Sequence, residues 1–197
     1  MAQPDPSHHS NHHHHGDSCC QQSTAPRSVY QTLDEMDFER GLWSAAVDGE
    51  VDRVRKFLDK GEDPNTMDKS GFAPLHYACR NGHKEITSML LQKGANPNVQ
   101  TRSGGATPLH RAAYAGHIDI IECLLSHGAT PSLCDEDGKS PLHKAAERGH
   151  TNICKRLLEA DPSILHIKDK RNNLPVFYVS VSNKELQTIL HHDASGT

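Results

Sequence analysis

Three stretches of this 197-residue chain are near copies of one another and recur at an almost constant interval. They read PLHYACRNGH from residue 74, PLHRAAYAGH from residue 108 and PLHKAAERGH from residue 141. A period of 33 or 34 residues is far longer than that of a coiled coil and is typical of stacked helical repeats. Such arrays bury their cores between neighbouring units and present an extended surface, so the pattern favours binding over catalysis in a closed cavity.

Each copy predicts two short helices separated by a tight turn. A proline opens each copy, and proline suits the first position of a helix because its missing N–H has no partner there in any case. Thr107 and Ser140 precede it as helix N-caps, a role that Ala73 cannot fill. Glycine is expected where a helix ends in a residue with positive φ. Such glycines stand at 49, 82, 116 and 149 after the first helices and at 61, 94 and 128 after the second.

The repeated motif resembles the signature of a known family. Thr-Pro-Leu-His-x-Ala from Thr107 to Ala112, with close variants at 73–78 and 140–145, is similar to the motif of ankyrin repeats. The resemblance implies an all-α repeat solenoid of helix-turn-helix pairs joined by β-hairpin fingers, with four repeats and a partial C-terminal cap. We expect a degenerate first repeat at 37–67, further repeats at 68–100, 101–134 and 135–168, a partial capping repeat at 169–192 and a short tail at 193–197.

The two end repeats depart from the motif. In the first, Trp43 stands where later copies have histidine, and we expect this large side chain to cover the end of the stack. In the cap, Pro175 and Phe177 align with the proline and histidine of the motif. Asn172 and Asn183 replace the turn glycine and the inter-helix glycine; we expect both to adopt positive φ, which asparagine tolerates better than most residues.

Charge and hydropathy narrow the class of partner. The chain has 21 Lys and Arg against 25 Asp and Glu, a net charge of -4, and no long basic run, so we expect neither nucleic acid nor a membrane surface as the partner. Its apolar runs are much shorter than the roughly 18 residues of a membrane-spanning helix, and its first residues lack the apolar stretch of a signal peptide. Six cysteines without a Cys-x-x-Cys pair are typical of reduced thiols. We expect a monomer in the cytoplasm, the nucleus or both, with a protein as its partner.

The first 28 residues have a different composition from the repeats. They are rich in His, Ser and Pro and poor in apolar residues, which predicts a disordered tail, with residues 29–36 as an extension before the first repeat. Imidazole and thiol groups bind zinc, copper or nickel. The candidate ligands are His12, His13, His14, His15, Cys19 and Cys20. Their spacing defines no tetrahedral site, so adventitious binding by a low-complexity tail or tag is the alternative, and we expect no resident cofactor.

Histidines and cysteines within the repeats are predicted to be structural. His76, His110 and His143 belong to the repeated motif, and three more histidines follow the inter-helix glycines at 83, 117 and 150. Their recurrence indicates hydrogen-bonding roles in the fold rather than catalysis. Cys134 lies in a predicted finger, and no histidine or acid is tied to it by sequence spacing. We therefore expect no catalytic residue.

The family resemblance also implies a partner-binding surface. Ankyrin proteins usually meet a ligand with their finger tips and the exposed concave face of the first helices. The matching positions are Lys69, Phe72, Tyr77, Arg80 and Asn81 in the second repeat, Arg102, Arg111 and Tyr114 in the third, and Lys139, Lys144, Glu147 and Arg148 in the fourth. Tyr, Phe and Arg are enriched in binding hot spots, so the second and third repeats are the expected centre, and a partner segment with acidic and apolar character would suit them.

Two functions follow as hypotheses from these observations. The first is a non-catalytic protein-interaction module, acting as an adaptor or regulatory subunit, because the repeats occupy most of the chain. The alternative is a metal-handling protein that uses the His- and Cys-containing tail.

Overall fold

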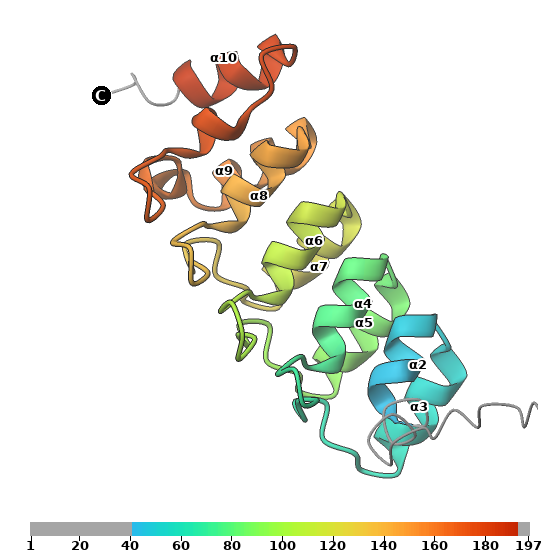
Figure 1. Cartoon of the computed structure of the whole chain (residues 1–197). Coiled ribbons are helices and arrows are strands. Elements are labelled where there is room, and N and C mark those ends of the chain that lie inside the picture. Colours follow the sequence, from blue (N-terminus) through green and yellow to red (C-terminus); the bar gives the residue numbers. More distant parts are fainter. Residues whose placement is uncertain (1–40, 193–197) are drawn as a thin grey trace, which may run out of the picture. The chain divides into compact units, whose positions relative to one another are not determined.

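The computed structural model describes residues 41–192, and within this range the chain forms α-helices, two short 3₁₀ helices and connecting loops, with no strand. The helices follow one another in pairs (Figure 1). Their bounds are α2 Leu42–Asp48, α3 Val51–Asp59, α4 Pro74–Asn81, α5 Lys84–Gln92, α6 Pro108–Ala115, α7 Ile118–Ser126, α8 Pro141–Arg148, α9 Thr151–Ala160, η1 Pro162–His166, η2 Pro175–Tyr178 and α10 Lys184–His192. The predicted tails and the predicted extension at 29–36 lie outside the described residues.

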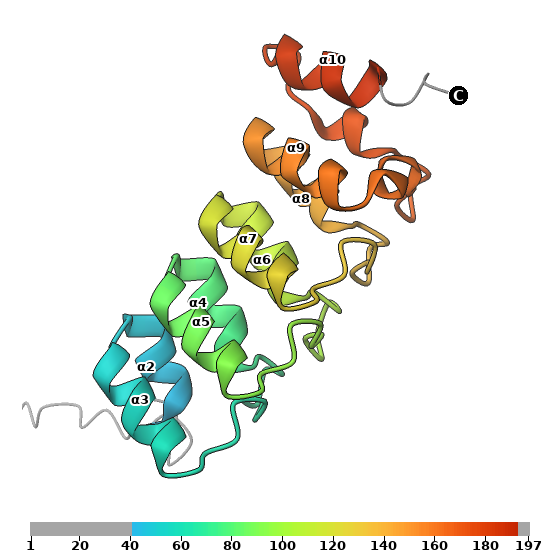
Figure 2. The same ribbon diagram turned by 180° about the vertical axis from the view of Figure 1, so that it is seen from behind.

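Helices of the same kind stack in chain order. The first helices α2, α4, α6 and α8 contact one another in succession, and the second helices α3, α5, α7 and α9 form a parallel layer. Figures 1 and 2 show the two layers from opposite sides, with the connecting loops on one edge. The prediction of an all-α repeat solenoid is confirmed.

The core lies between the two layers and between neighbouring pairs. Leu109, next to the first-helix proline, is 1% exposed, and Ala112 and Ala113 beyond it are fully buried. These small residues let the first helices approach closely, while Ile120 and Leu124 fill the space from the second helix. Because each pair completes the core of its neighbours, a repeat removed from the stack would expose this apolar surface.

A histidine ring packs against the inter-helix glycine of the preceding repeat. Gly82 has φ 85°, and a β-carbon at this position would lie 2.8 Å from Cε1 of His117. The ring Nε2 of His117 lies 3.2 Å from the carbonyl oxygen of Arg80. The same bond joins His83 to Val47 at 2.9 Å and His150 to Tyr114 at 3.2 Å. Glycine is therefore required for a positive φ, as predicted, and also to leave room for the ring.

Each motif histidine closes its own helix and holds the next finger. The backbone N–H groups of Ala73, Thr107 and Ser140 donate to Nδ1 of the histidine three residues later, at 3.0, 3.2 and 3.1 Å. An Nδ1 that accepts leaves the ring proton on Nε2, and in His110 this group donates to the Lys139 carbonyl at 2.9 Å. Burial lowers the pKa of His110 to about 4, so the ring is neutral at pH 7. The predicted structural role of these histidines is confirmed.

Trp43 takes over the hydrogen bond of the histidine that it replaces. Its indole Nε1–H donates to the Thr66 carbonyl at 2.9 Å. One repeat later, Nε2 of His76 lies 3.1 Å from the carbonyl of Val99, the residue equivalent to Thr66. The degenerate first repeat thus keeps the link between its first helix and its own loop, although the tryptophan remains only half-buried.

The fingers between repeats are reverse turns rather than β-hairpins. In the third finger the Asp135 N–H donates to the Lys139 carbonyl at 2.9 Å. Consecutive fingers are joined by single bonds, including one from the Glu136 N–H to the Gly104 carbonyl at 2.9 Å. The bonds within each finger close a reverse turn, as the Gly138 N–H to Asp135 carbonyl bond does, and do not extend into a strand ladder, so residues 41–192 contain no strand.

The C-terminal cap confirms one prediction about asparagine and contradicts the other. Asn172 has φ 64° and replaces the turn glycine, as expected. Asn183 does not replace the inter-helix glycine: its Nδ2 lies 3.6 Å from where a β-carbon on Gly149 would be, the place taken by histidine rings in earlier repeats. Its Oδ1 accepts a hydrogen bond from the Leu186 N–H at 3.1 Å. Asn183 therefore stands for the histidine and caps α10, because the missing residue of the cap is the glycine itself.

Phe177 also differs from the histidine with which it aligns. It is 71% exposed, whereas the motif histidines are buried, and the helix that carries it is only the 3₁₀ helix η2. A motif histidine binds a carbonyl of the finger that follows it, and the described chain offers no further finger after Phe177. The aromatic ring is left at the surface.

Candidate functional site

The predicted partner surface lies on one side of the first helices and on the fingers beside them; we call it the first-helix face. Its central side chains come from α4, α6 and α8 and from the fingers that precede these helices. Exposed on it are Lys69, Arg80, Asn81, Arg102, Tyr114, Glu147 and Arg148, and partly buried are Phe72, Tyr77, Arg111, Lys139 and Lys144. Asn81 is also structural, because its side chain donates to the Val47 carbonyl at 2.9 Å.

In the fingers that begin at Asp68, Asp135 and Asp169, the aspartate at the base has two separate partners. In the fourth repeat, Oδ1 of Asp135 accepts the Lys139 N–H at 2.9 Å and closes the turn, while Oδ2 lies 2.7 Å from Nζ of Lys144. Burial is the largest single influence on Asp135 and raises its pKa, but the hydrogen bonds from Lys144 and the Lys139 N–H, together with the charge of Lys144, make the net shift downward. Asp68 and Asp169 repeat the arrangement, with the hydroxyls of Tyr77 and Tyr178 as the second partners. One carboxylate oxygen closes the turn of the finger, and the other binds the side chain of the residue that follows the motif histidine or its equivalent.

The third repeat breaks this pattern at Thr101. The Thr101 hydroxyl accepts the Ala106 N–H at 3.0 Å and so performs the turn-closing role of the aspartate. A threonine has no second oxygen and no charge, so it offers nothing to Arg111, the residue equivalent to Tyr77 and Lys144. Within residues 41–192, Arg111 makes no ion pair.

Arg111 is held by stacking instead of by an acid. Its guanidinium carbon lies 4.8 Å from the centroid of the Phe72 ring in the preceding repeat, a cation–π geometry. Its Nε is buried and has no hydrogen-bond partner among the described residues. Burial, and then the neighbouring charge of Arg80, lower the pKa of Arg111, although an arginine stays charged at neutral pH. Two cations, Arg80 and Arg111, therefore stand close together on the first-helix face, and neither has an ion-pair partner among residues 41–192.

A second stacked arginine lies one repeat further on. The guanidinium carbon of Arg148 is 4.9 Å from the centroid of the Tyr114 ring, which is 44% exposed. By contrast, the lysines of this repeat are paired: Lys144 with Asp135, and Lys139 with Glu147 at 3.6 Å. Among the described residues, the arginines Arg80, Arg111 and Arg148 of this face therefore have no ion-pair partner, whereas its lysines in the fourth repeat do.

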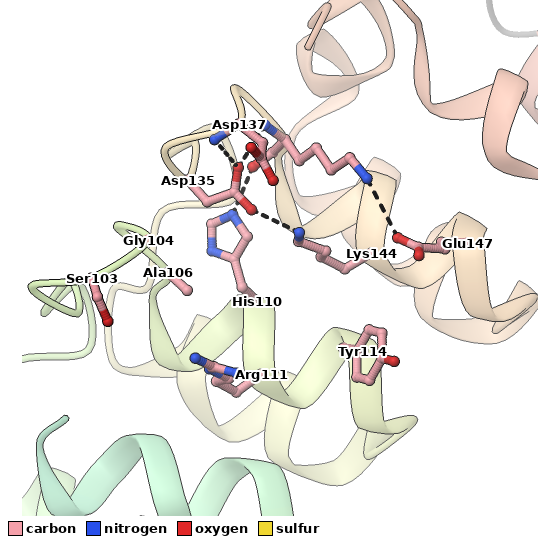
Figure 3. A pocket seen from close by; sticks show the side chains of 11 residues that line it. Ser103, Gly104, Ala106, His110, Arg111, Tyr114, Asp135, Asp137, Lys144 and Glu147 are labelled. Atoms are coloured by element: carbon pink, nitrogen blue, oxygen red, sulfur yellow. Dashed lines mark hydrogen bonds and ion pairs between the residues drawn. The ribbon is translucent and has the colours of Figure 1, made fainter. Parts of the chain in front are cut away.

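Figure 3 shows a pocket of about 350 Å³ between the third and fourth repeats. Arg111 and Tyr114 line it from α6, while Asp135 and Lys144 line it from the finger and α8. His110 is also part of the lining, but Nδ1 accepts the Thr107 N–H and Nε2 donates to the Lys139 carbonyl. The one imidazole in the pocket is therefore occupied at both nitrogens and is not arranged as a general base.

Other chemistry finds little support in the described part of the chain. Burial raises the pKa of the Cys79, Cys123, Cys134 and Cys154 thiols, to about 12 for Cys154, which is the opposite of an activated nucleophile. Between residues 41 and 192 no three metal-binding side chains gather at one point. No described helix is both long and apolar enough to span a bilayer. The predicted metal ligands of the tail lie outside the described residues and stay a prediction.

Comparison with known proteins gives the family. The sequence matches the family described as ankyrin repeats (3 copies) over residues 42–133 and ankyrin repeats (many copies) over residues 116–158. The chain belongs to the ankyrin repeat family. The two matches together extend over more than half of its residues and over every helix pair from α2 to α9 except the last residues of α9.

Individual ankyrin proteins align with shorter parts of the chain. It is 51% identical over 78 residues to human ankyrin repeat domain-containing protein 39, covering 40% of this chain and 43% of that protein. The bovine protein of the same name is 57% identical over 61 residues, 31% of this chain and 33% of that protein. Guinea pig scaffold protein ILK is 40% identical over 62 residues, 31% of this chain and 14% of that protein. The alignments span less than half of each of these relatives.

The sequence of this ankyrin protein contains a signal for the unpaired arginine, in the residue at the base of each finger. Asp68, Asp135 and Asp169 recur with the repeat period, and Thr101 interrupts the series. Only the contacts in the structure show that an aspartate in place of Thr101 would lie beside Arg111. Tyr77, Arg111 and Lys144 were predicted as partner-binding positions, but the acidic partners of Tyr77 and Lys144 were not predicted.

Proposed function

We propose that this chain is a non-catalytic protein-interaction module that acts as an adaptor or regulatory subunit and binds its partner through the finger tips and the first-helix face. The observation that supports it most is the group of Phe72, Arg80, Arg111 and Tyr114, which combines exposed or half-buried aromatics with arginines that have no ion-pair partner in the described part of the chain. Aromatic and arginine side chains of this kind dominate the energetics of protein interfaces. The name of the aligned scaffold protein ILK is consistent with such a role.

The fold supports binding for a second reason. Each helix pair is fixed by its neighbours through buried leucines, histidine bonds and finger bonds, so the first-helix face is preorganised. A rigid surface loses little conformational entropy when it binds a partner. The side chains on that face therefore vary without altering the fold, and their identity determines which partner is bound.

The experiment is a quantitative affinity purification from cells with the full chain and a pair of matched double variants. Arg80→Ala with Tyr114→Ala removes one positive charge and one aromatic from the first-helix face, at positions that are exposed. Arg55→Ala with Gln92→Ala removes one positive charge from the second-helix layer, also at exposed positions. We expect specific partners to be lost with the first variant and kept with the second. An unchanged partner list for both, with both variants folded by circular dichroism, would contradict the proposed face.

A further inference from the structure

We infer that Arg111 is the anchor point for an aspartate or glutamate side chain of the partner, flanked in that partner by an apolar or aromatic residue. This inference rests on the proposed interaction function and specifies the chemistry of the segment that is bound. The starting observation is the finger of the third repeat. Among the fingers of the described chain, this one has a threonine, Thr101, at its base, so it supplies no carboxylate to Arg111, the residue that follows the motif histidine.

The other repeats show which interaction the third repeat lacks. Asp135 uses its second oxygen to hold Lys144 at 2.7 Å, and Asp68 and Asp169 use theirs to accept a tyrosine hydroxyl. The geometry of the stack therefore brings an acidic oxygen to this position in each neighbouring repeat. In the third repeat Thr101 stands at the base of the finger, so the acidic oxygen is missing beside the cation Arg111.

The hydrogen-bonding state of Arg111 points to the same ligand. Its Nε donor is buried and unsatisfied, and a buried donor without an acceptor costs free energy that a new acceptor would recover. Stacking on Phe72 at 4.8 Å fixes one face of the guanidinium, and a planar fork held in this way suits a carboxylate. The arrival of a carboxylate, with a small rotation of the arginine, would supply the acceptor that the free protein lacks.

The surroundings specify the rest of the ligand. Arg80 adds a second positive charge that lowers the pKa of Arg111 through like-charge repulsion, so a single negative charge relieves an existing repulsion. Phe72, Tyr77 and Tyr114 are the aromatic neighbours on the same face, and they would contact an apolar residue beside the acid. Asp68 lies in the adjoining finger, so the site suits the single charge of a carboxylate better than a doubly charged phosphate.

The repeat pattern provides a test that leaves Arg111 in place. Thr101→Asp installs the carboxylate found in the other fingers, where it would pair with Arg111 and compete with the acid of the partner. Thr101→Asn has nearly the same shape and keeps a turn-closing oxygen, but it carries no charge. The two variants differ only in the property that the inference invokes.

The probe is a displayed library of random 12-residue peptides, selected against the full-length wild type, Thr101→Asp, Thr101→Asn and Arg111→Gln. For the wild type and Thr101→Asn we expect selected peptides that share an Asp or Glu next to an aromatic or aliphatic residue. This preference should disappear with Thr101→Asp and Arg111→Gln. For the most enriched peptide, replacing its acid by the corresponding amide should weaken binding to the wild type by about tenfold and leave binding to Thr101→Asp nearly unchanged.

The outcomes separate this inference from the proposed function. If the wild type selects peptides that lack an acid, or if Thr101→Asp keeps the acidic preference, the Arg111 anchor is wrong while the interaction function stands. If those peptides also bind the Arg80→Ala, Tyr114→Ala variant as well as they bind the wild type, the first-helix face is wrong too. If no peptide is selected by the folded wild type, both are overturned.

Discussion

The imidazole ring of His117 occupies the space that a side chain on Gly82 would need. A β-carbon on Gly82 would lie 2.8 Å from Cε1 of the ring, and the ring is held there by its bond to the Arg80 carbonyl. This contact joins the second repeat to the third, and it recurs between the first and second repeats (Gly49 and His83) and between the third and fourth (Gly116 and His150). It makes the inter-helix glycines different from the glycines that merely end the second helices.

Gly82→Ala should therefore destabilise the protein more than Gly94→Ala does. Both glycines have positive φ, at 85° and 91°, so both substitutions share the cost of a left-handed alanine, roughly 1–2 kcal/mol. Gly94 has nothing within 4 Å of the added carbon, whereas Gly82 meets the ring. We expect a further loss of about 1–2 kcal/mol at Gly82 from the forced shift of His117. Urea unfolding followed by circular dichroism measures both, and equal losses would mean that the ring moves away freely.

Stability should fall as the pH is lowered from about 7 towards 4. Burial lowers the pKa of His76 and His110 from 6.5 to about 4, so in this window the unfolded chain binds protons that the folded chain does not. A group with this shift contributes stability above its unfolded pKa that is lost as the pH falls, about 2 kcal/mol for each histidine at pH 5. Protonation would also place a donor on Nδ1 where a backbone N–H already donates.

The measurement is the urea midpoint between pH 4.5 and 7.5 for the wild type and for His76→Gln with His110→Gln. Glutamine keeps an acceptor for the N-cap N–H but does not titrate. The variant should be less stable than the wild type at pH 7, and its stability should change less with pH. A slope as steep as that of the wild type would show that other groups carry the pH dependence.

Trp43→Phe should weaken the first repeat by about 1 kcal/mol. The substitution keeps a large aromatic ring but removes the N–H that donates to the Thr66 carbonyl at 2.9 Å. The carbonyl is then left without this donor, as the Val99 carbonyl would be without the ring of His76. Amide hydrogen exchange should show faster opening of α2 and α3 and little change in α8 and α9. Uniform changes along the stack would contradict a role confined to the end repeat.

Asn172→Ala should destabilise the tip of the last described finger more than Asn172→Gly does. Asn172 has φ 64°, which glycine adopts without strain and alanine does not. We expect the glycine variant to be within about 0.5 kcal/mol of the wild type and the alanine variant to lose about 1 kcal/mol. Thermal unfolding of the two variants gives the comparison, and equal midpoints would argue against a conformational requirement at this position.

Most of the fold could be predicted because its determinants are local. Pro108 begins a helix, Gly116 ends it with φ 95°, and the apolar residues after Ile118 repeat with helical spacing. These preferences act within one helix pair, and the 33-residue period repeats them along the chain. The cap was predicted less well: with one residue missing, the alignment alone gave no reason to prefer the histidine position to the glycine position for Asn183.

The candidate surface could be predicted only as a set of positions. The chain by itself determined which residues follow the motif histidine, because the motif recurs in register at His76, His110 and His143. The tertiary structure decided which of these residues have an acidic partner within the protein. Lys144 pairs with Asp135 and Tyr77 donates to Asp68, whereas among the described residues Arg111 stacks on the Phe72 ring of the preceding repeat and has no acidic partner. The aspartate pairs join a finger to the helix that follows it, and the Arg111–Phe72 contact joins two neighbouring repeats. Whether each charge or hydrogen-bonding group finds a partner therefore depends on distances in the folded stack, which local sequence preferences do not encode.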